Sequence, residues 1–363
     1  MVDAAGFAPA SSSAPPAALR VADEVVKRFG LGALLEAEVI ATGLLNQNLR
    51  AATARGNFFL KGYRYVDPAP VAREHRLIAF AAAHGVPAVA PLAAPGGETF
   101  LRAGGRLWAV FPFVTGRQLR PEAIGPDLAA EMGRTLGRLH TVLAQLPAHE
   151  AARFPPKLLW DSAQCAAEMA GYEAQIKAKR APDAFDLRAL TSFGYRRTLL
   201  ATGMPPLAAF AWLPVQLLHG DFHDRNLFFG ADGSITGIID WELAAHGPRA
   251  WEIIRALDVA LNLPQDLASG GARLRAFLHG YAAEAPLTVE ECQAMPDLYW
   301  VYRVHSLWVF EEHYRKGSAR TDHLAMEDVP ALEWWQRHRA AVATALIDAL
   351  RSAPAVRLAR AQE

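Results

Sequence analysis

Short apolar runs dominate the first third of the chain and predict β-strands. Their alternating or continuous apolar pattern, with a turn at 55–57, is typical of strands joined by tight connections. A helix is predicted after Pro70, because Val71, Leu77 and Ile78 repeat at helical spacing. Strands with one inserted helix indicate a small α+β unit. The predicted strands are Glu38–Ala41, Leu49–Ala52, Phe58–Lys61, Thr99–Leu101 and Leu107–Phe111.

Beyond Gly116 the pattern changes to longer helical stripes. The stripe from Leu128 to Leu143 begins after Pro126-Asp127, which is a suitable helix start. One β-island, Leu227–Ile239, follows the apolar run Val215–Leu218 and is broken by a Gly-Ala-Asp-Gly turn. We therefore predict a disordered leader over residues 1–20, an N-terminal lobe over 21–112 and a C-terminal lobe over 113–363. Further helices are predicted near 161–180, 186–200, 249–262, 270–284, 297–316 and 328–352.

Composition narrows the class of protein but does not identify its function. The chain has 363 residues, of which 52% are hydrophobic and 20% are charged, as in ordinary soluble globular proteins. Its 37 basic and 37 acidic residues balance, which gives no global electrostatic case for binding nucleic acid or an anionic membrane. The N-terminus lacks the features of a signal peptide, and no apolar run reaches the ~18 residues of a membrane span. We expect a cytoplasmic protein.

The cysteines and histidines give no strong sign of a metal centre. Cys165 and Cys292 lie far apart, and we interpret them as buried small hydrophobic residues in a reducing compartment. His219 and His223 have His-x3-His spacing, but they flank a predicted turn and not a helix. Nothing in that setting makes the two side chains face the same way, as a zinc pair would.

The strongest chemical signal is the octapeptide H-G-D-F-H-D-R-N at 219–226, with Asp240 fourteen residues after Asn226. If a three-residue loop at 232–234 closes the hairpin, Asn226 and Asp240 face each other across its strands. Two oxygen donors there suit magnesium, and Asp221 lies just before them, where it can orient a hydroxyl. Acids and amides are also common in turns, so the octapeptide alone is compatible with an ordinary turn.

The segments H-G-D-F-H-D-R-N-L-F-F and G-I-I-D-W-E resemble the catalytic segment of the aminoglycoside phosphotransferase and choline kinase superfamily. The resemblance can be traced over roughly residues 34 to 260. It implies an α+β, protein-kinase-like two-lobed fold with a small β-rich N-lobe and a larger, mostly helical C-lobe. It also implies that Asp221 is the catalytic aspartate and that Asn226 and Asp240 are magnesium ligands. His219 and His140 would then be structural.

The resemblance requires a strand lysine for the nucleotide phosphates, paired with a helix glutamate. Lys61 ends an apolar strand, and Glu74 lies on the apolar stripe of the predicted helix. Two opposite charges that both point inward fit a pair, because a lone buried charge is costly. The alternative is that each side chain extends along an edge of the lobe to reach water.

Two further segments complete the nucleotide site that the resemblance implies. The loop over 42–48 would cover the phosphates, and it has one glycine, with Asn46 and Asn48 supplying turn geometry. An ordinary hairpin turn is the alternative. The segment from Phe111 to Arg117 resembles the hinge between lobes, where adenine would bond the carbonyl of Pro112 and the amide of Val114. Glu252 stands where relatives often carry aspartate, which puts that contact in doubt.

The predicted activity is transfer of the ATP γ-phosphate to a hydroxyl of a small metabolite or antibiotic, with GTP not excluded as donor. A non-catalytic nucleotide-binding protein is the alternative, and a protein kinase is a weaker prediction because no obvious activation segment follows Asp240.

The sequence does not identify the acceptor. A cationic acceptor would use acids and aromatics, an anionic one would use Arg303 and Arg315, and Trp300, Val304 and Trp308 also fit a plain core stripe. The acids and aromatics are Asp161, Glu168, Glu173, Tyr299, Trp300, Tyr302, Trp308, Glu311 and Glu312.

Overall fold

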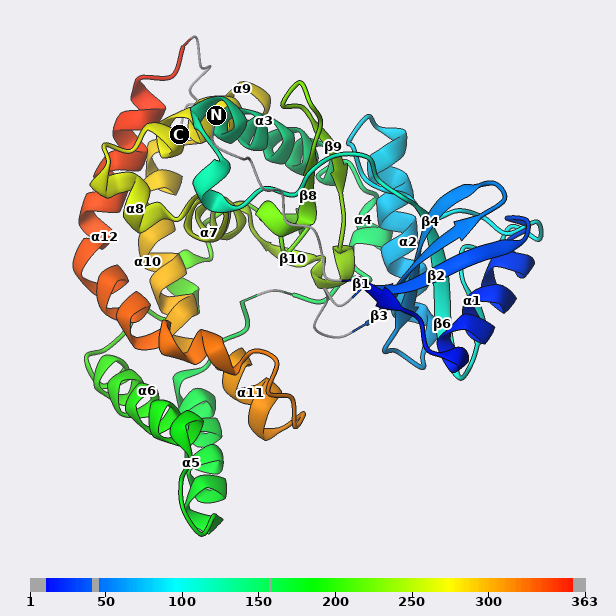
Figure 1. Cartoon of the computed structure of the whole chain (residues 1–363). Coiled ribbons are helices and arrows are strands. Elements are labelled where there is room, and N and C mark those ends of the chain that lie inside the picture. The colour runs from blue at the N-terminus through cyan, green and yellow to red at the C-terminus, as the bar shows by residue number, and fades with distance from the viewer. Residues whose placement is uncertain (1–10, 41–45, 157, 355–363) are drawn as a thin grey trace, which may run out of the picture.

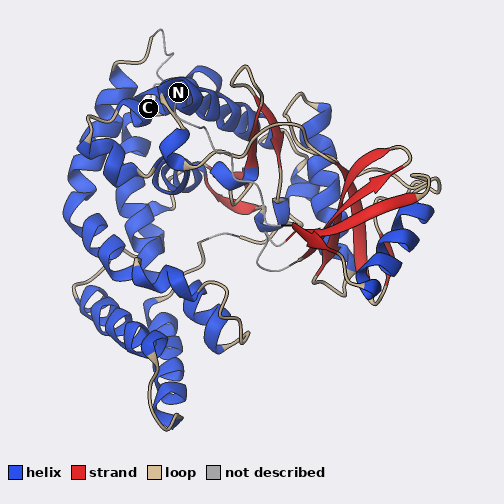
Figure 2. Cartoon of the chain, in the orientation of Figure 1, coloured by secondary structure: helices blue, strands red, loops and turns tan. Residues whose placement is uncertain are grey.

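The computed structural model describes residues 11–40, 46–156 and 158–354, which form a small β-rich lobe and a larger helical lobe (Figures 1 and 2). The small lobe contains one six-stranded antiparallel sheet with strand order β1-β2-β3-β4-β6-β5. Helix α1 (Pro16–Arg28) packs on one face of this sheet, and α2 (Pro68–Ala83) lies between the sheet and the other lobe. The strands are β1 (Ser11–Ser13), β2 (Leu34–Ile40), β3 (Gln47–Thr53), β4 (Gly56–Tyr63), β5 (Leu101–Ala103) and β6 (Arg106–Pro112).

The structure of the first described residues differs from the predicted disordered leader. The prediction of disorder over 1–20 is wrong for residues 11–20, because β1 pairs with β2 and α1 begins at Pro16. Ala18, Ala22 and Val25 of α1 are buried against the sheet. These small residues look like low-complexity sequence, yet their helical spacing gives them one apolar face. Residues 1–10 lie outside the described residues, as do Ala41 and positions 42–45 of the expected phosphate loop.

Four of the predicted strands correspond to β2, β3, β4 and β6. The strand predicted at Thr99–Leu101 is displaced and is β5, Leu101–Ala103. In β3 the buried residues alternate, with Leu49 and Ala51 turned to α1. Helix α2 starts at Pro68, where the Asp67 carboxylate accepts a hydrogen bond of 2.9 Å from the Ala69 amide. This cap and the burial of Val71, Leu77 and Ile78 fix the helix that carries Glu74.

The large lobe is built around helix α3, which packs closely against α9. A Cβ atom added at Gly133 would lie 2.0 Å from the Phe277 carbonyl oxygen, and one at Gly280 would lie 2.1 Å from that of Ala130. Only glycine permits this approach of two backbones. No helix in the described ranges is long and apolar enough to cross a bilayer. The helices are α3 (Pro126–Leu143), α4 (Ala148–Ala151), α5 (Ser162–Ala178), α6 (Ala184–Ala201), α7 (Arg249–Leu261), α8 (Leu263–Ala268), α9 (Ala272–Glu284), α10 (Val289–His305), α11 (Trp308–Tyr314) and α12 (Asp328–Arg351).

Two short sheets lie between these helices and the small lobe (Figure 2). Strand β7 (Val215–Leu218) pairs with β10 (Ala245–Pro248), and β8 (Leu227–Phe229) pairs with β9 (Ile235–Ile238), both antiparallel. Strand β10 is not predicted by the sequence pattern, because its A-H-G-P segment has neither β-branched residues nor alternation.

The helix predicted near 297–316 is in fact two helices. Helix α10 begins at Val289, where Thr288 and Glu291 form a capping box, and it continues through Pro296. It ends at His305, and α11 begins at Trp308. Trp300 and Val304 are buried, but Trp308 is 44% exposed, so the predicted core stripe is wrong for that residue.

Candidate active site

The turn that carries Asp221 follows β7, and the β8–β9 hairpin returns the chain to it. Leu227 pairs with Ile238, and the Ile239 amide donates to the Asn226 carbonyl. The register therefore sets Ile239 opposite Asn226, so the predicted facing of Asn226 and Asp240 is wrong. The loop is longer than the predicted three residues, because β8 ends at Phe229 and β9 starts at Ile235, although Gly233 has the expected positive φ of 85°.

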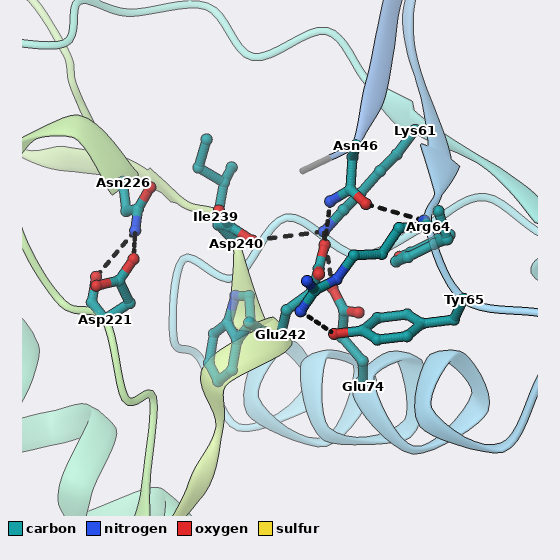
Figure 3. A network of polar contacts seen from close by, with 12 residues as sticks. Asn46, Lys61, Arg64, Tyr65, Glu74, Asp221, Asn226, Ile239, Asp240 and Glu242 are labelled. Atoms are coloured by element: carbon teal, nitrogen blue, oxygen red, sulfur yellow. Dashed lines mark hydrogen bonds and ion pairs between the residues drawn. The ribbon is translucent and has the colours of Figure 1, made fainter. Parts of the chain in front are cut away.

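Asp221 is held through both of its carboxylate oxygens. Arg255 of α7 donates to Oδ1 over 2.5 Å. The Asn226 amide donates to Oδ2 over 3.0 Å (Figure 3). His223 lies 3.4 Å from Oδ2. Burial alone would raise the pKa of Asp221, but the positive charge of Arg255 and the His223 contact outweigh it and hold that pKa well below its usual range. Asp221 is therefore ionised, oriented and a weak base.

Lys61 lies at the centre of a second cluster, on the small-lobe side of the site (Figure 3). Its ammonium group is 3.2 Å from Glu74, 3.5 Å from Asp240 and 2.6 Å from Glu242. Burial alone would lower the pKa of Lys61, but Glu74 and the other anionic neighbours raise it well above its usual value. The ammonium group is therefore charged, and the alternative in which Lys61 and Glu74 reach separately for water does not hold.

The three carboxylates around one ammonium group leave the cluster with excess negative charge. Burial of Glu74, together with Glu242 and Asp240, outweighs the attraction of Lys61 and raises the pKa of Glu74 to about 7. In an unfolded chain the same carboxyl group titrates near 4.3. The folded protein therefore binds a proton at Glu74 more tightly than the unfolded chain does.

This difference predicts a pH effect on stability. The native state binds more protons at Glu74 than the unfolded state between about pH 4.5 and 7, so its stabilising contribution is lost as the pH rises through that window. From about pH 5 to pH 8, the loss should be about 2 to 3 kcal/mol. The Glu74→Gln variant lacks the titration and should gain that much relative to the wild-type protein. Denaturant unfolding of both proteins at the two pH values, without nucleotide or metal, measures it; a constant difference between them would contradict it.

The remaining residues of the predicted nucleotide site have different surroundings. Asn46 bridges two elements, because its amide donates to the Glu242 carboxylate and its oxygen accepts from the Arg64 amide at 3.2 Å. Asn48 lies within β3, opposite Lys61 in the sheet register. Pro112 ends β6, and Val114 lies in the connection to the large lobe, packed near Gly237. Their nucleotide contacts stay predictions.

Glu252 joins the Asp221 turn to helices α3 and α7. Its buried carboxylate accepts from the His219 amide at 3.1 Å, from the Gly220 amide, and from His140 at 2.9 Å. His219 in turn accepts from the Asp221 amide and contacts the Ile239 carbonyl oxygen at 3.0 Å. The longer side chain at this position therefore makes the structural contact that the sequence left in doubt.

Removing this carboxylate should cost stability. Glu252→Ala leaves buried amides and His140 without an acceptor, so we expect a loss of roughly 3 to 5 kcal/mol in the free energy of unfolding. Glu252→Gln keeps one oxygen and should lose less. Denaturant midpoints of both variants measure which loses more stability. The prediction would be wrong if the alanine variant were as stable as the wild-type protein.

A divalent cation would find oxygen donors in this site. Asp240 has a positive φ of 61° and a side chain that is 49% exposed, so its carboxylate is accessible from solvent. The Asn226 amide nitrogen is used on Asp221, which leaves its oxygen directed away from that residue (Figure 3). The described residues contain no cluster of three or more His, Cys, Asp and Glu side chains that could hold a metal. A site with few protein ligands, completed by phosphates and water, is what magnesium uses.

Two site residues, Glu242 and Arg255, are missed by sequence reasoning. The Trp-Glu pair after Asp240 is visible in the sequence, but nothing there places Glu242 beside Lys61. Arg255 does carry a signal, since it stands between the apolar residues Ile254 and Ala256 on a largely apolar helix. That is the same signal that identifies Lys61.

Comparisons with known proteins agree on one family. The model of the phosphotransferase enzyme family matches residues 36–289. A homoserine kinase of Paramagnetospirillum magneticum is 26% identical over 283 residues, which cover 76% of this chain and 80% of that protein. A homoserine kinase of Caulobacter sp. strain K31 is 28% identical over 276 residues, covering 74% and 78%.

Solved structures show the same fold at low sequence identity. The amicoumacin kinase hAmiN, in complex with AMP-PNP, Ca²⁺ and Ami, aligns with a TM-score of 0.59 at 17% identity, covering 88% of this chain and 92% of that chain. The spectinomycin phosphotransferase APH(9)-Ia, with ADP and spectinomycin, aligns at 0.61 and 14% identity, covering 90% and 98%. These matches confirm the predicted two-lobed α+β fold. Since the family model covers well over half of its residues, this chain belongs to the phosphotransferase enzyme family.

Proposed function

We propose that this protein is a small-molecule kinase that transfers the γ-phosphate of ATP to a hydroxyl of a small metabolite or antibiotic. The observation that carries the proposal is the convergence of Lys61, Asp221, Asn226 and Asp240 between the lobes (Figure 3). Such an enzyme needs a cation for the phosphates, a residue that orients the hydroxyl and oxygen ligands for metal. GTP is not excluded as the donor.

Asp221 would orient the acceptor hydroxyl. Its low pKa makes it a weak base, which suits a loose transition state in which the proton leaves the hydroxyl late. Arg255 and Asn226 fix the direction of its carboxylate, so the hydroxyl has one position in which to dock. Orientation of this kind lowers the entropic cost of bringing hydroxyl and phosphate together.

Lys61 would bind the nucleotide phosphates, with Glu74 fixing its side chain. Magnesium, when bound, would neutralise phosphate charge, and Asn226 and Asp240 would hold it. Asn46, Asn48, Pro112 and Val114 would complete the nucleotide site through the covering loop and the hinge.

The acceptor is a small alcohol rather than a protein in this proposal. Among the relatives described above, two are homoserine kinases and two structures are of kinases that act on antibiotics. Homoserine is therefore the first acceptor to test, with aminoglycosides, amino alcohols and sugars beside it. The cytoplasmic location expected from the sequence stays a prediction.

A non-catalytic nucleotide-binding protein is the competing function. It predicts the loss of at least one of Lys61, Asp221, Asn226 and Asp240, and the chain keeps all four. A screen of nucleotide consumption by the purified protein against the alcohol panel separates the two. Acceptor-dependent ADP release supports the kinase, whereas nucleotide binding without ADP release from any alcohol supports the alternative.

A further inference from the structure

Two polar contacts on neighbouring turns of α7 lie between Asp221 and Arg303 of α10. Arg255 donates to Asp221 and lies 5.7 Å from the Trp251 ring. One helical turn along α7, Asp258 accepts hydrogen bonds of 2.9 Å from Tyr299 and from Arg303 of α10. Because residues three apart share a helix face, Arg255 and Asp258 are neighbours roughly 5 to 6 Å apart at their Cβ atoms.

Both guanidinium groups keep an unused donor. The Nη1 atom of Arg255 and the Nε atom of Arg303 are buried and have no hydrogen-bond acceptor among the described residues. A buried N–H without a partner costs free energy, so such a group in a functional region needs an explanation. The side chains of Asp221, Arg255 and Arg303 are 17%, 18% and 24% exposed, so part of each side chain is open to solvent although the two unused donor atoms are buried.

Arg303 is also held in place before any ligand arrives. Its bond to Asp258 and the Tyr299 ring, 5.8 Å from the guanidinium carbon, fix the planar group. A fixed guanidinium fork matches the two oxygens of a carboxylate and loses little entropy on binding it.

We propose that the acceptor carries a carboxylate, which Arg255 and Arg303 bind while its hydroxyl lies at Asp221. This inference rests on the proposed kinase function and names the substrate class of the same site. Arg255 stands about one helical turn from Asp258, the residue that holds Arg303. A site of this size suits a small hydroxy acid or hydroxy amino acid better than a bulky polycation.

Three of the other residues considered for the acceptor make contacts away from Asp221. Arg315 is 56% exposed and lies beside Glu168 and Glu311. Asp161 caps α5 through the Gln164 amide, and Glu173 pairs with Arg197 at 2.6 Å. Beside Asp221, Arg255 and Arg303 lies one more acid of α7, Asp258, whose Oδ2 already accepts two bonds.

The first test uses the wild-type protein and pairs each carboxylate-bearing alcohol with its amide. L-homoserine is compared with L-homoserinamide, and 4-hydroxybutanoate with 4-hydroxybutanamide, alongside aminoglycosides, sugars and amino alcohols. We expect kcat/KM to be about 30-fold or more lower for each amide, because the buried arginines lose their anionic partner. Equal or faster turnover of amides, sugars or cationic alcohols would overturn the carboxylate site and leave the kinase function intact. Turnover of no alcohol at all would overturn both.

The second test compares Arg303→Gln with Arg315→Gln. We expect the first change to lower kcat/KM for the acid about 30-fold or more, with little effect on the amide or on the affinity for ATP. The Arg315→Gln variant removes the same charge from an exposed position and should behave as the wild-type protein. Unchanged turnover of the acid by Arg303→Gln would overturn the proposal. If that variant does not fold, the ratio of kcat/KM for the acid to that for the amide, measured with the wild-type protein, still tests the proposal.

Discussion

Replacing Asp221 by asparagine should lower turnover by about 10² to 10⁴-fold while the affinity for ATP stays close to that of the wild-type protein. The substitution keeps the size of the side chain but removes the charge that aligns the acceptor hydroxyl. Among the described residues, Lys61, assigned to the phosphates, and Asp240, assigned to the metal, form no hydrogen bond or ion pair with Asp221. Asn226, the other proposed metal ligand, donates to Asp221, and an asparagine at 221 keeps an oxygen that can accept this bond. Steady-state kinetics and calorimetric titration of ATP measure the two quantities separately.

The control for this variant must account for Arg255. Without the Asp221 charge, Arg255 has no carboxylate partner, and a buried unpaired charge is destabilising. Thermal unfolding should therefore accompany the kinetics, at a temperature where the variant is folded. Asp232→Asn, on the hairpin loop, removes a charge outside the site and should not alter turnover. Undiminished turnover by folded Asp221→Asn would sink the catalytic assignment.

Replacing Asp240 by asparagine should abolish most of the magnesium dependence of nucleotide binding. The carboxylate is 49% exposed beside Lys61, and it is the only carboxylate among the two proposed metal ligands. We expect the affinity for ATP with magnesium to fall at least about tenfold, and the affinity without magnesium to change little. Asparagine tolerates the left-handed backbone at this position, so the fold should be preserved.

Titrations of ATP with magnesium and with a chelator give the required comparison. Glu242→Gln is a useful companion, because Glu242 also contacts Lys61 but is not assigned to the metal. If Asp240→Asn bound ATP with the wild-type affinities under both conditions, its role as a ligand would be wrong.

In the small lobe, the sequence predicts the site residues where a charge stands on an apolar pattern. Lys61 in a strand and Glu74 on a helix stripe are unexpected locally, and the structure brings them within 3.2 Å. Glu242 carries no such signal, because its role depends on a fold that sets the large lobe against β4. The facing of Asn226 and Asp240 is mistaken by one residue, because the loop is longer than predicted and an irregularity in β8 shifts the register.

The fold was predictable where helices and strands have strong periodicity. The lobes and helix α3 follow from it, and the solved structures confirm the fold class. Helix α1 was missed because half of its buried face is alanine. The early start of α10 was missed because Pro296 lies inside the helix, although a capping box supports its first turn. Local composition predicts helices poorly where packing or a cap determines whether a helix forms and where it begins.

Phosphorus NMR of the reaction mixture tests the central claim most directly. The wild-type protein with ATP, magnesium and the alcohol panel should produce a new phosphomonoester signal, matched by an equal amount of ADP. The Asp221→Asn variant at the same concentration should produce almost none. A wild-type protein that binds ATP and yields no phosphomonoester from any alcohol would contradict the account.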